Sequence, residues 1–127
     1  MRASGRDVRV VDGSGVAPLS FEWGTLRWLF NKETDPHAQQ TFGLCRIEPG
    51  EANPRHFHPN CEEILYVLCG ECDHTFGTQV VRLKPGMMIR IPSGVPHNAR
   101  CVSAEPLEAV ISFSSPDRQT VGEDSAG

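Results

Sequence analysis

Residues 50 to 70 of the chain read Gly50-Glu-Ala-Asn-Pro-Arg-His56-Phe-His58-Pro-Asn-Cys-Glu-Glu63-Ile-Leu-Tyr-Val-Leu-Cys-Gly70. Residues two apart in an extended segment project from the same side, so His56 and His58 can point into one cavity. Glu63 begins an apolar run and shares a face with every second residue of it. A carboxylate in such a row is costly unless it is paired or bound to a metal. The stretch therefore predicts a buried site built from imidazoles and a carboxylate.

A second stretch follows after 15 residues and reads Gly86-Met-Met-Ile-Arg-Ile-Pro92-Ser-Gly94-Val-Pro-His97. The first stretch resembles the first motif of the cupin superfamily, in which His-x-His, a glutamate and a glycine follow an initial glycine at fixed intervals. The second resembles the second cupin motif up to its histidine. The resemblance covers residues 50 to 101 closely. One departure is Cys101, which stands where the motif usually has asparagine and removes no ligand.

The resemblance implies an all-β, single-domain jelly-roll β-barrel of antiparallel strands. It also implies that His56, His58, Glu63 and His97 bind one divalent transition metal ion in the mouth of the barrel. Imidazole and carboxylate ligands suit Fe, Mn, Cu, Ni and Zn alike, so the metal stays open. The neighbouring Glu62 is a competing ligand, but the six-residue interval to Gly70 favours Glu63 and leaves Glu62 facing outward.

Composition supports one β domain. The chain has 127 residues with 12 Gly and 10 Pro, a density typical of short strands joined by turns. We expect an arm over residues 1–18, the barrel over 19–114 and a tail over 115–127. Hydrophobic patterning between turn signals predicts strands at Phe21–Phe30, Thr41–Ile47, Ile64–Leu68, Cys72–Phe76, Val80–Leu83, Met87–Ile91 and Leu107–Phe113, in a fold of about eight strands.

Charge and hydropathy disfavour several classes of partner. The net charge is −4 and no run of Lys or Arg occurs, so we expect neither nucleic acid nor a membrane surface as a partner. The longest apolar run, Ile64 to Cys69, is far shorter than a membrane-spanning helix. The polar N-terminal segment and the odd number of cysteines, five, favour a cytoplasmic protein with reduced thiols.

Four residues outside the ligand set have two interpretations each. His74 is either a general base or second layer of the metal site, or a hydrogen-bonded wall residue. Cys101 shares strand parity with His97, and its thiol either lies near the metal or packs as a small hydrophobe. Arg90 and Arg118 either pair with a substrate carboxylate or face solvent.

Two further sets of side chains are also ambiguous. Cys69-Gly-Glu-Cys72 has the spacing of zinc and redox sites, but a turn is expected between the two cysteines and no second such pair exists, which favours a structural role. The aromatic residues Trp23, Trp28 and Phe30 either stack a flat substrate or pack the fold.

The strand that begins at Glu63 predicts a contact with another chain. Its opposite face carries Ile64, Tyr66 and Leu68, so both faces are apolar although a small barrel has only one inside. We therefore expect the outer row to be covered by the N-terminal strand, a second sheet or another protomer, and a homodimer is the hypothesis.

Three imidazoles and one carboxylate leave open positions on a metal ion. The leading hypothesis is a metal-dependent oxidoreductase, similar to single-domain cupin dioxygenases and oxidases, acting on a small organic substrate. The alternatives are a redox-neutral isomerase, lyase or polyketide cyclase, and a sugar or small-ligand binding barrel with a structural metal.

Overall fold

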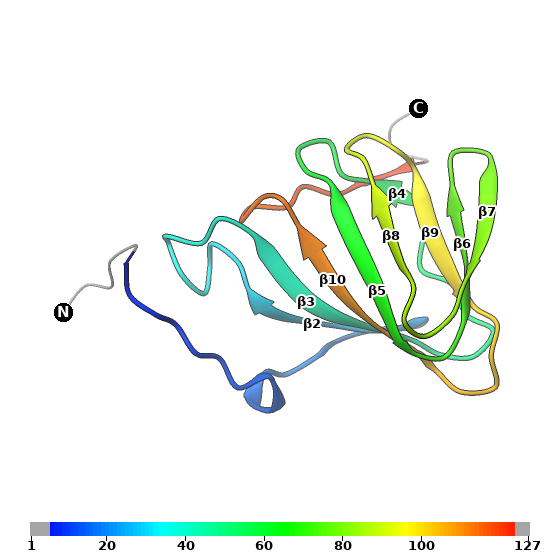
Figure 1. The fold of residues 1–127 in the computed structure, drawn as a ribbon, viewed down its shortest axis with the longest axis horizontal. Coiled ribbons are helices and arrows are strands. Elements are labelled where there is room, and N and C mark those ends of the chain that lie inside the picture. Colours follow the sequence, from blue (N-terminus) through cyan, green and yellow to red (C-terminus); the bar gives the residue numbers. More distant parts are fainter. Residues whose placement is uncertain (1–5, 124–127) are drawn as a thin grey trace.

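The computed structural model describes residues 6–123, which form two facing antiparallel sheets (Figure 1). The elements in chain order are the 3₁₀ turn η1 (Gly13–Gly15) and the strands β1 (Leu19–Phe21), β2 (Gly24–Phe30), β3 (Thr41–Ile47), β4 (His56–Phe57), β5 (Glu63–Cys69), β6 (Cys72–Phe76), β7 (Gln79–Leu83), β8 (Met88–Ile91), β9 (His97–Cys101), β10 (Leu107–Phe113) and β11 (Val121–Gly122). The expected all-β jelly roll is confirmed.

The larger sheet has the order β1-β2-β3-β10-β5-β8, and the smaller has the order β11-β4-β9-β6-β7. The described strands form these two separately hydrogen-bonded sheets, so the expected barrel is a pair of facing layers rather than one closed cylinder. Jelly rolls are built from two sheets in this way. The space between the layers holds both the core and the site described below.

Alternation of side chains places the core between the sheets. In β3, β5 and β10 every second residue is buried, as period-2 patterning requires, except Cys69 at the end of β5. Ile47, Val67 and Leu107 are fully buried and contribute to one hydrophobic cluster. The same alternation puts Glu63, the first residue of β5, in the buried row.

Most predicted strands occur close to their expected positions, and three of them, β3, β6 and β10, have the expected bounds. The strand expected at Phe21–Phe30 is instead a hairpin, in which β1 pairs with β2 in the register Leu19↔Leu26. The two-residue strands β4 and β11 were not predicted. They are too short to carry a pattern of their own and pair with each other only because the chain folds back.

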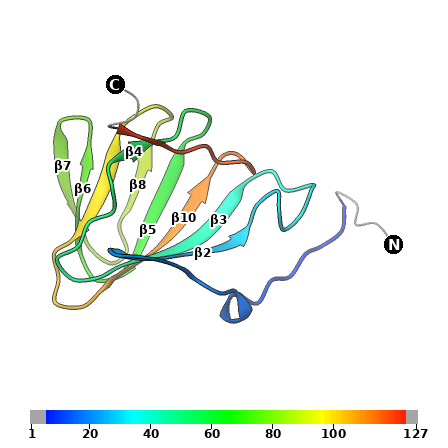
Figure 2. The ribbon, with the colours of Figure 1, turned by 180° about the vertical axis from the view of Figure 1, so that it is seen from behind.

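The C-terminal segment is not detached from the sheets, as the expected tail would be. It crosses the upper edge of the molecule and ends in β11 beside β4 (Figure 2). Arg55 of the loop before β4 forms an ion pair with Glu123, 2.9 Å from Nε to Oε2. The domain bounds 19–114 stay a prediction, but within residues 115–123 the stretch 115–117 contacts Lys32 and Thr41, and Val121–Gly122 forms an edge strand of the smaller sheet.

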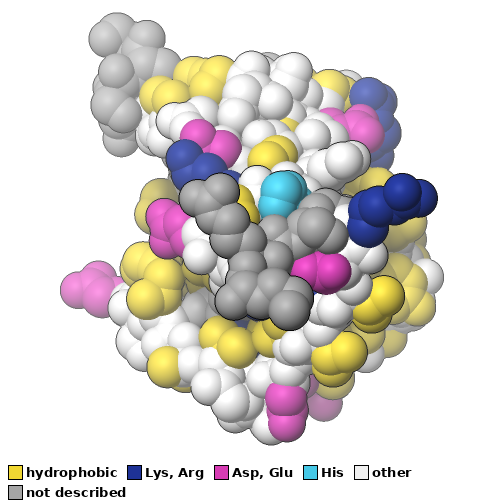
Figure 3. All heavy atoms as spheres, turned by 90° about the vertical axis from the view of Figure 1, so that its left-hand side faces the viewer, with side chains coloured by type: hydrophobic (Ala, Val, Ile, Leu, Met, Phe, Trp, Pro, Cys, Tyr) yellow, Lys and Arg dark blue, Asp and Glu magenta, His cyan; other side chains and the backbone are white. Residues whose placement is uncertain are grey.

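The surface carries mixed charges. On the visible described part of the face in Figure 3, basic and acidic side chains lie interspersed with hydrophobic ones. Among residues 6–123, no helix is long and apolar enough to cross a membrane.

Candidate metal centre

The four expected ligand residues come together from both sheets. His56 in β4 and His97 in β9 are directly paired residues of the smaller sheet, and His58 follows β4. Glu63 reaches His58 and His97 from the larger sheet. Strand pairing thus brings together His56 and His97, which are 41 positions apart in the chain. The carboxylate of Glu63 joins them from the opposite sheet.

The distances within this cluster fit a single ion. Oε1 of Glu63 lies 3.1 Å from Nε2 of His58 and 2.9 Å from Nε2 of His97. The ring centroids of His56 and His97 are 4.4 Å apart. One ligand atom from each of the four residues lies within 4.8 Å of all the others, so the cluster could hold a metal ion.

Backbone carbonyls orient all three imidazoles. Nδ1 of His56 lies 2.8 Å from the carbonyl of Pro54, and Nδ1 of His97 lies 2.9 Å from that of Val95. Nδ1 of His58 lies 2.9 Å from the carbonyl of Gln119. A carbonyl oxygen only accepts, so each Nδ1 donates its proton and each Nε2 keeps a lone pair. Such outer hydrogen bonds are typical of metal-bound histidines.

The electrostatics of the cluster also fit a cation. Glu63 is buried, and two of its nearest neighbours are Nε2 atoms that carry lone pairs. A carboxylate oxygen and a lone pair repel each other at these distances unless a proton or a metal cation lies between them. Burial raises the pKa of Glu63, but hydrogen bonds donated by Nε2 of His58 and His97, with a proton in the position that a metal cation would take, lower it more, and the net pKa then lies below its usual range.

Burial also keeps the half-buried His56 available as a ligand. Loss of solvation, with a smaller contribution from the charge of His97, lowers the pKa of His56 to about 4. The imidazole is therefore neutral at pH 7, and metal binding requires neutral imidazole.

The cluster opens into a cavity of about 330 Å³ between the sheets. Aromatic and aliphatic side chains form most of its wall, among them Trp23, Trp28, Leu65, Ile111 and Phe113. The polar part of the lining comes from the histidines, Glu63, Asn53, Arg55, Arg118 and Thr120. A cavity that is largely apolar with a few convergent polar groups is typical of a small-molecule site.

His74 lies beside the cluster, as the first of its two interpretations requires. Its ring stacks on that of His97, with centroids 5.7 Å apart and an interplanar angle of 12°. The side chain is buried and lines the cavity, and its Nδ1 has no hydrogen-bond partner among the described residues. Burial lowers its pKa to about 4.

Cys101 lies away from the cavity. It shares the buried face of β9 with His97, as its parity predicts, but it is not among the lining residues. Its Sγ lies 3.3 Å from the carbonyl of Glu105, and it belongs to the hydrophobic cluster. The packing interpretation fits this position.

Arg90 and Glu62 lie outside the site. Nε of Arg90 donates to Oε2 of Glu62 in an exposed ion pair. The structure therefore does not bring Arg90 to the ligand cluster, and Glu62 faces outward as expected. Arg118, in contrast, lines the cavity.

The two cysteines around the turn at Gly70 separate in space. Cys69 is exposed and donates to Glu108, whereas Cys72 is fully buried in the core. Both are free thiols, one at the end of β5 in the larger sheet and the other at the start of β6 in the smaller sheet, which fits the structural interpretation.

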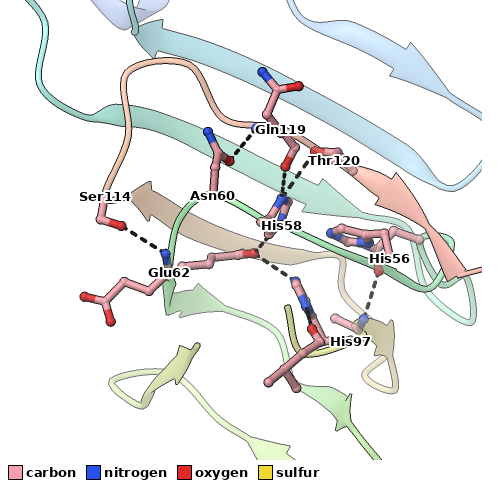
Figure 4. A network of polar contacts seen from close by, with 12 residues as sticks. His56, His58, Asn60, Glu62, His97, Ser114, Gln119 and Thr120 are labelled. Atoms are coloured by element: carbon pink, nitrogen blue, oxygen red, sulfur yellow. Dashed lines mark hydrogen bonds and ion pairs between the residues drawn. The ribbon is translucent and has the colours of Figure 1, made fainter. Parts of the chain in front are cut away.

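Sequence reasoning missed the role of Gln119 and Thr120. The carbonyl of Gln119 accepts from His58, and Oγ1 of Thr120 lies 3.3 Å from the same Nδ1 (Figure 4). Asn60 fixes this segment, because its Oδ1 accepts from the backbone N–H of Gln119 at 2.9 Å. No motif marks these positions, since a backbone carbonyl can come from any residue type.

Trp23 and Trp28 both line the cavity, whereas Phe30 does not. Trp23 stacks on Phe21, with ring centroids 5.0 Å apart. Trp28 packs edge-on against Phe113. The two tryptophans are thus placed where a flat ligand would contact them.

A family model described as the cupin domain matches residues 43–113 of the chain. The chain belongs to the cupin family. This cupin is 30% identical over 106 residues to the polyketide synthase CurC of Streptomyces cyaneus, a match that covers 84% of this chain and 69% of that protein. It is 33% identical over 88 residues to germin-like protein subfamily 2 member 1 of Arabidopsis thaliana, covering 62% of this chain and 40% of the plant protein.

Solved structures agree on the fold. This cupin superposes on the oxalate decarboxylase of Lactobacillus farciminis, in a formate complex, with a TM-score of 0.80 at 22% identity, covering 87% of this chain and 34% of that one. The Bacillus subtilis oxalate decarboxylase, which has Mn(II) centres, gives a TM-score of 0.78 at 20% identity, covering 84% and 30%. At such identities the likeness shows the fold alone.

Proposed function

We propose that this cupin is a metal-dependent enzyme acting on a flat, oxygen-rich organic substrate, with His56, His58, Glu63 and His97 holding one divalent transition metal ion. The observation that carries the proposal is the convergence of three Nε2 lone pairs and a buried carboxylate on the wall of an aromatic cavity. When bound, Fe, Mn, Cu, Ni or Zn would supply a Lewis acid with open positions for substrate oxygens.

The protein's own residues have defined tasks in this proposal. Backbone carbonyls of residues 54, 95 and 119 keep the three Nε2 atoms directed at one point. Trp23, Trp28 and Phe113 bind the apolar frame of the substrate and exclude water from it. His74, neutral at pH 7, is the buried base nearest the ligand cluster that is not itself a ligand.

We place a redox-neutral reaction first, namely enolisation and ring closure of a polycarbonyl substrate. Two observations support this order over the oxidoreductase expected from the sequence. The cavity of about 330 Å³ suits a multi-ring or polycarbonyl frame, and a relative that this chain matches over 84% of its length is named a polyketide synthase. The oxidoreductase is the second candidate, supported by the three-histidine, one-glutamate ligand set with its open coordination positions.

One experiment separates these reactions. Protein loaded with each metal in turn is mixed with benzoylacetone, an aromatic 1,3-diketone, in D₂O under nitrogen, and NMR follows exchange of the central hydrogens above the rate in a protein-free solution with the same metal. Metal-dependent exchange that is lost on His97→Ala supports the first reaction. Oxygen uptake in air without such exchange supports the second. A protein that shows no exchange and no oxygen uptake would contradict both reactions and favour the binding barrel.

We also propose that the chain forms a homodimer through the outer face of β5 and β8. Ile64, Tyr66, Leu68 and Met88 expose 39% to 49% of their surface there. Charged side chains of both signs, Arg90 and Glu62, lie at the side of this row, a mixture that can match a second copy of itself. The cytoplasmic location stays a prediction, which cell fractionation would test.

A further inference from the structure

Arg118 occupies an unusual position for a cation. Its guanidinium carbon lies 4.4 Å from the ring centroid of Trp28 and 5.2 Å from that of Phe113. The side chain is half-buried and lines the cavity, and its Nε is buried with no hydrogen-bond partner within residues 6–123. Loss of solvation lowers its pKa, because the apolar surroundings disfavour the charged form.

Five other arginines among the described residues have carboxylate partners, whereas Arg27 and Arg100, which do not line the cavity, form no ion pair among those residues. Ion pairs join Arg9 to Asp35, Arg46 to Glu48 and Glu108, Arg55 to Glu123, Arg82 to Asp73 and Arg90 to Glu62. Within the part of the chain that the structure describes, no such ion pair is formed by Arg118. A guanidinium that has lost water and gained no anion carries unused hydrogen-bonding capacity.

The cation is also close to the candidate metal centre. The centroid of the Phe113 ring lies 5.0 Å from that of the His58 ring and 5.2 Å from the guanidinium carbon of Arg118. One aromatic ring thus contacts both a residue of the ligand cluster and Arg118, and all three side chains line the same cavity. A ligand held at the cluster and lying against Phe113 would extend toward the guanidinium.

We propose that Arg118 is an anion-recognition residue and that the natural ligand of the cavity is an aromatic carboxylate. The inference rests on the proposed function, whose substrate class it narrows. A carboxylate can accept two parallel hydrogen bonds from a guanidinium, and the flat frame beside it would stack on the tryptophans. The competing explanation is that Arg118 only braces Trp28 and Phe113 by stacking, with no ligand contact.

The test compares 2-naphthoate with its neutral analogue 2-naphthamide, using quenching of tryptophan fluorescence to follow binding. We expect the parent protein to bind naphthoate about tenfold more tightly than naphthamide, since a charge-assisted hydrogen bond contributes about that factor. Arg118→Gln should remove the preference and leave naphthamide affinity within about twofold. Arg82→Gln, at an exposed ion pair with Asp73 outside the cavity, is the matched control and should keep the preference for naphthoate.

Three results would overturn the inference. They are a parent protein without preference for naphthoate, an Arg118→Gln variant that weakens both probes equally, and a preference that disappears on chelation of metal but survives Arg118→Gln. The second result would mean that Arg118 only stabilises Trp28 and Phe113 by stacking. In that case the thermal unfolding midpoint of the variant would also be lower than that of the parent.

The same titrations distinguish failure of the inference from failure of the proposed function. They are run with metal-free and metal-loaded protein, beside a direct measurement of metal content. A preference for naphthoate in a protein that binds no metal would support the anion site and contradict the metal enzyme. Metal binding and diketone exchange without a preference for naphthoate would support the metal enzyme and contradict the anion site.

Discussion

The backbone carbonyl of Gln119 accepts a hydrogen bond from Nδ1 of His58 at 2.9 Å, across a sequence separation of 61 residues. This bond fixes the tautomer of His58 and directs its Nε2 toward Glu63. The C-terminal segment, which has no sequence motif of its own, is therefore part of the candidate metal centre.

Removing this segment should weaken metal binding. A chain ending at Asp117 loses the carbonyl of Gln119, and loss of such an outer contact costs about 10- to 100-fold in metal affinity. Metal titration monitored by calorimetry measures the effect. A chain ending at Glu123 keeps the contact and should bind as the parent does. Equal affinity of the two truncated chains would contradict the role assigned to the segment.

His97→Ala should abolish tight metal binding and leave the β fold in place. The variant removes one of four ligand atoms, whereas the pairing of β9 with β6 depends on backbone groups that remain. Metal content after dialysis and far-ultraviolet circular dichroism measure the two effects. His37→Ala, at an exposed loop position outside the cluster, is the control. A variant that retains metal as the parent does would show that the ligand set is misassigned.

The metal-free protein should lose stability as the pH falls from about 6.5 to about 4. Burial lowers the pKa of both His56 and His74 from 6.5 to about 4 in the folded chain. Between these two pH values the unfolded chain binds more protons than the folded chain. The free energy of unfolding therefore decreases as the pH decreases, and above pH 6.5 these two histidines no longer affect it. For the fully buried His74 the loss is at most about 3 kcal/mol.

Urea unfolding in EDTA at several pH values checks this dependence. His74→Gln should have a smaller loss of stability between pH 6.5 and 4 than the parent, and the exposed-site variant His37→Gln should match the parent. If parent and His74→Gln lose the same free energy over this range, His74 is not buried in its neutral form.

Gly70→Ala should destabilise the fold more than Gly77→Ala. Both glycines have positive φ, 74° and 56°, so alanine is strained at either position by about 1 kcal/mol. At Gly70 an added Cβ would also lie 2.5 Å from the carbonyl oxygen of Pro106, whereas at Gly77 it would meet open space. Urea midpoints of the two variants measure the difference. Equal midpoints would mean that the backbone near Pro106 yields without cost.

Tyr66→Glu should shift the protein from dimer to monomer. The parent should scatter light with twice the mass of one 14.0 kDa chain, and the variant with the mass of one. A charge buried against a second copy is costly, which is the reason for the shift. Val80→Glu, exposed on β7 of the other sheet, should leave the dimer intact. A parent mass of 14.0 kDa would refute the homodimer.

Local patterns made the central strands and the ligand types predictable. The alternation in β3, β5 and β10 appears directly in the sequence, because side chains two apart share a face whatever the rest of the fold does. The spacing of His56, His58 and Glu63 carries the same local information. Their gathering with His97 was available only through the family resemblance.

Tertiary structure decided the contacts made by groups without a local signal. The strands β4 and β11 have two residues each and form through pairing with distant segments, β11 with β4 and β4 also with β9. The same folding brought the carbonyl of Gln119 to His58 and separated Arg118, which lines the cavity, from Arg90, which pairs with Glu62 outside it.

By itself, then, the sequence determined an antiparallel β fold and the residue types of the ligand set, because strand periodicity and motif spacing are properties of neighbouring residues. Which cation faces the cavity, which carbonyls orient the imidazoles and what covers the ligands depend on how distant segments pack. The distances between side chains from distant segments depend on how the two sheets pack against each other. No single stretch of the sequence contains that information.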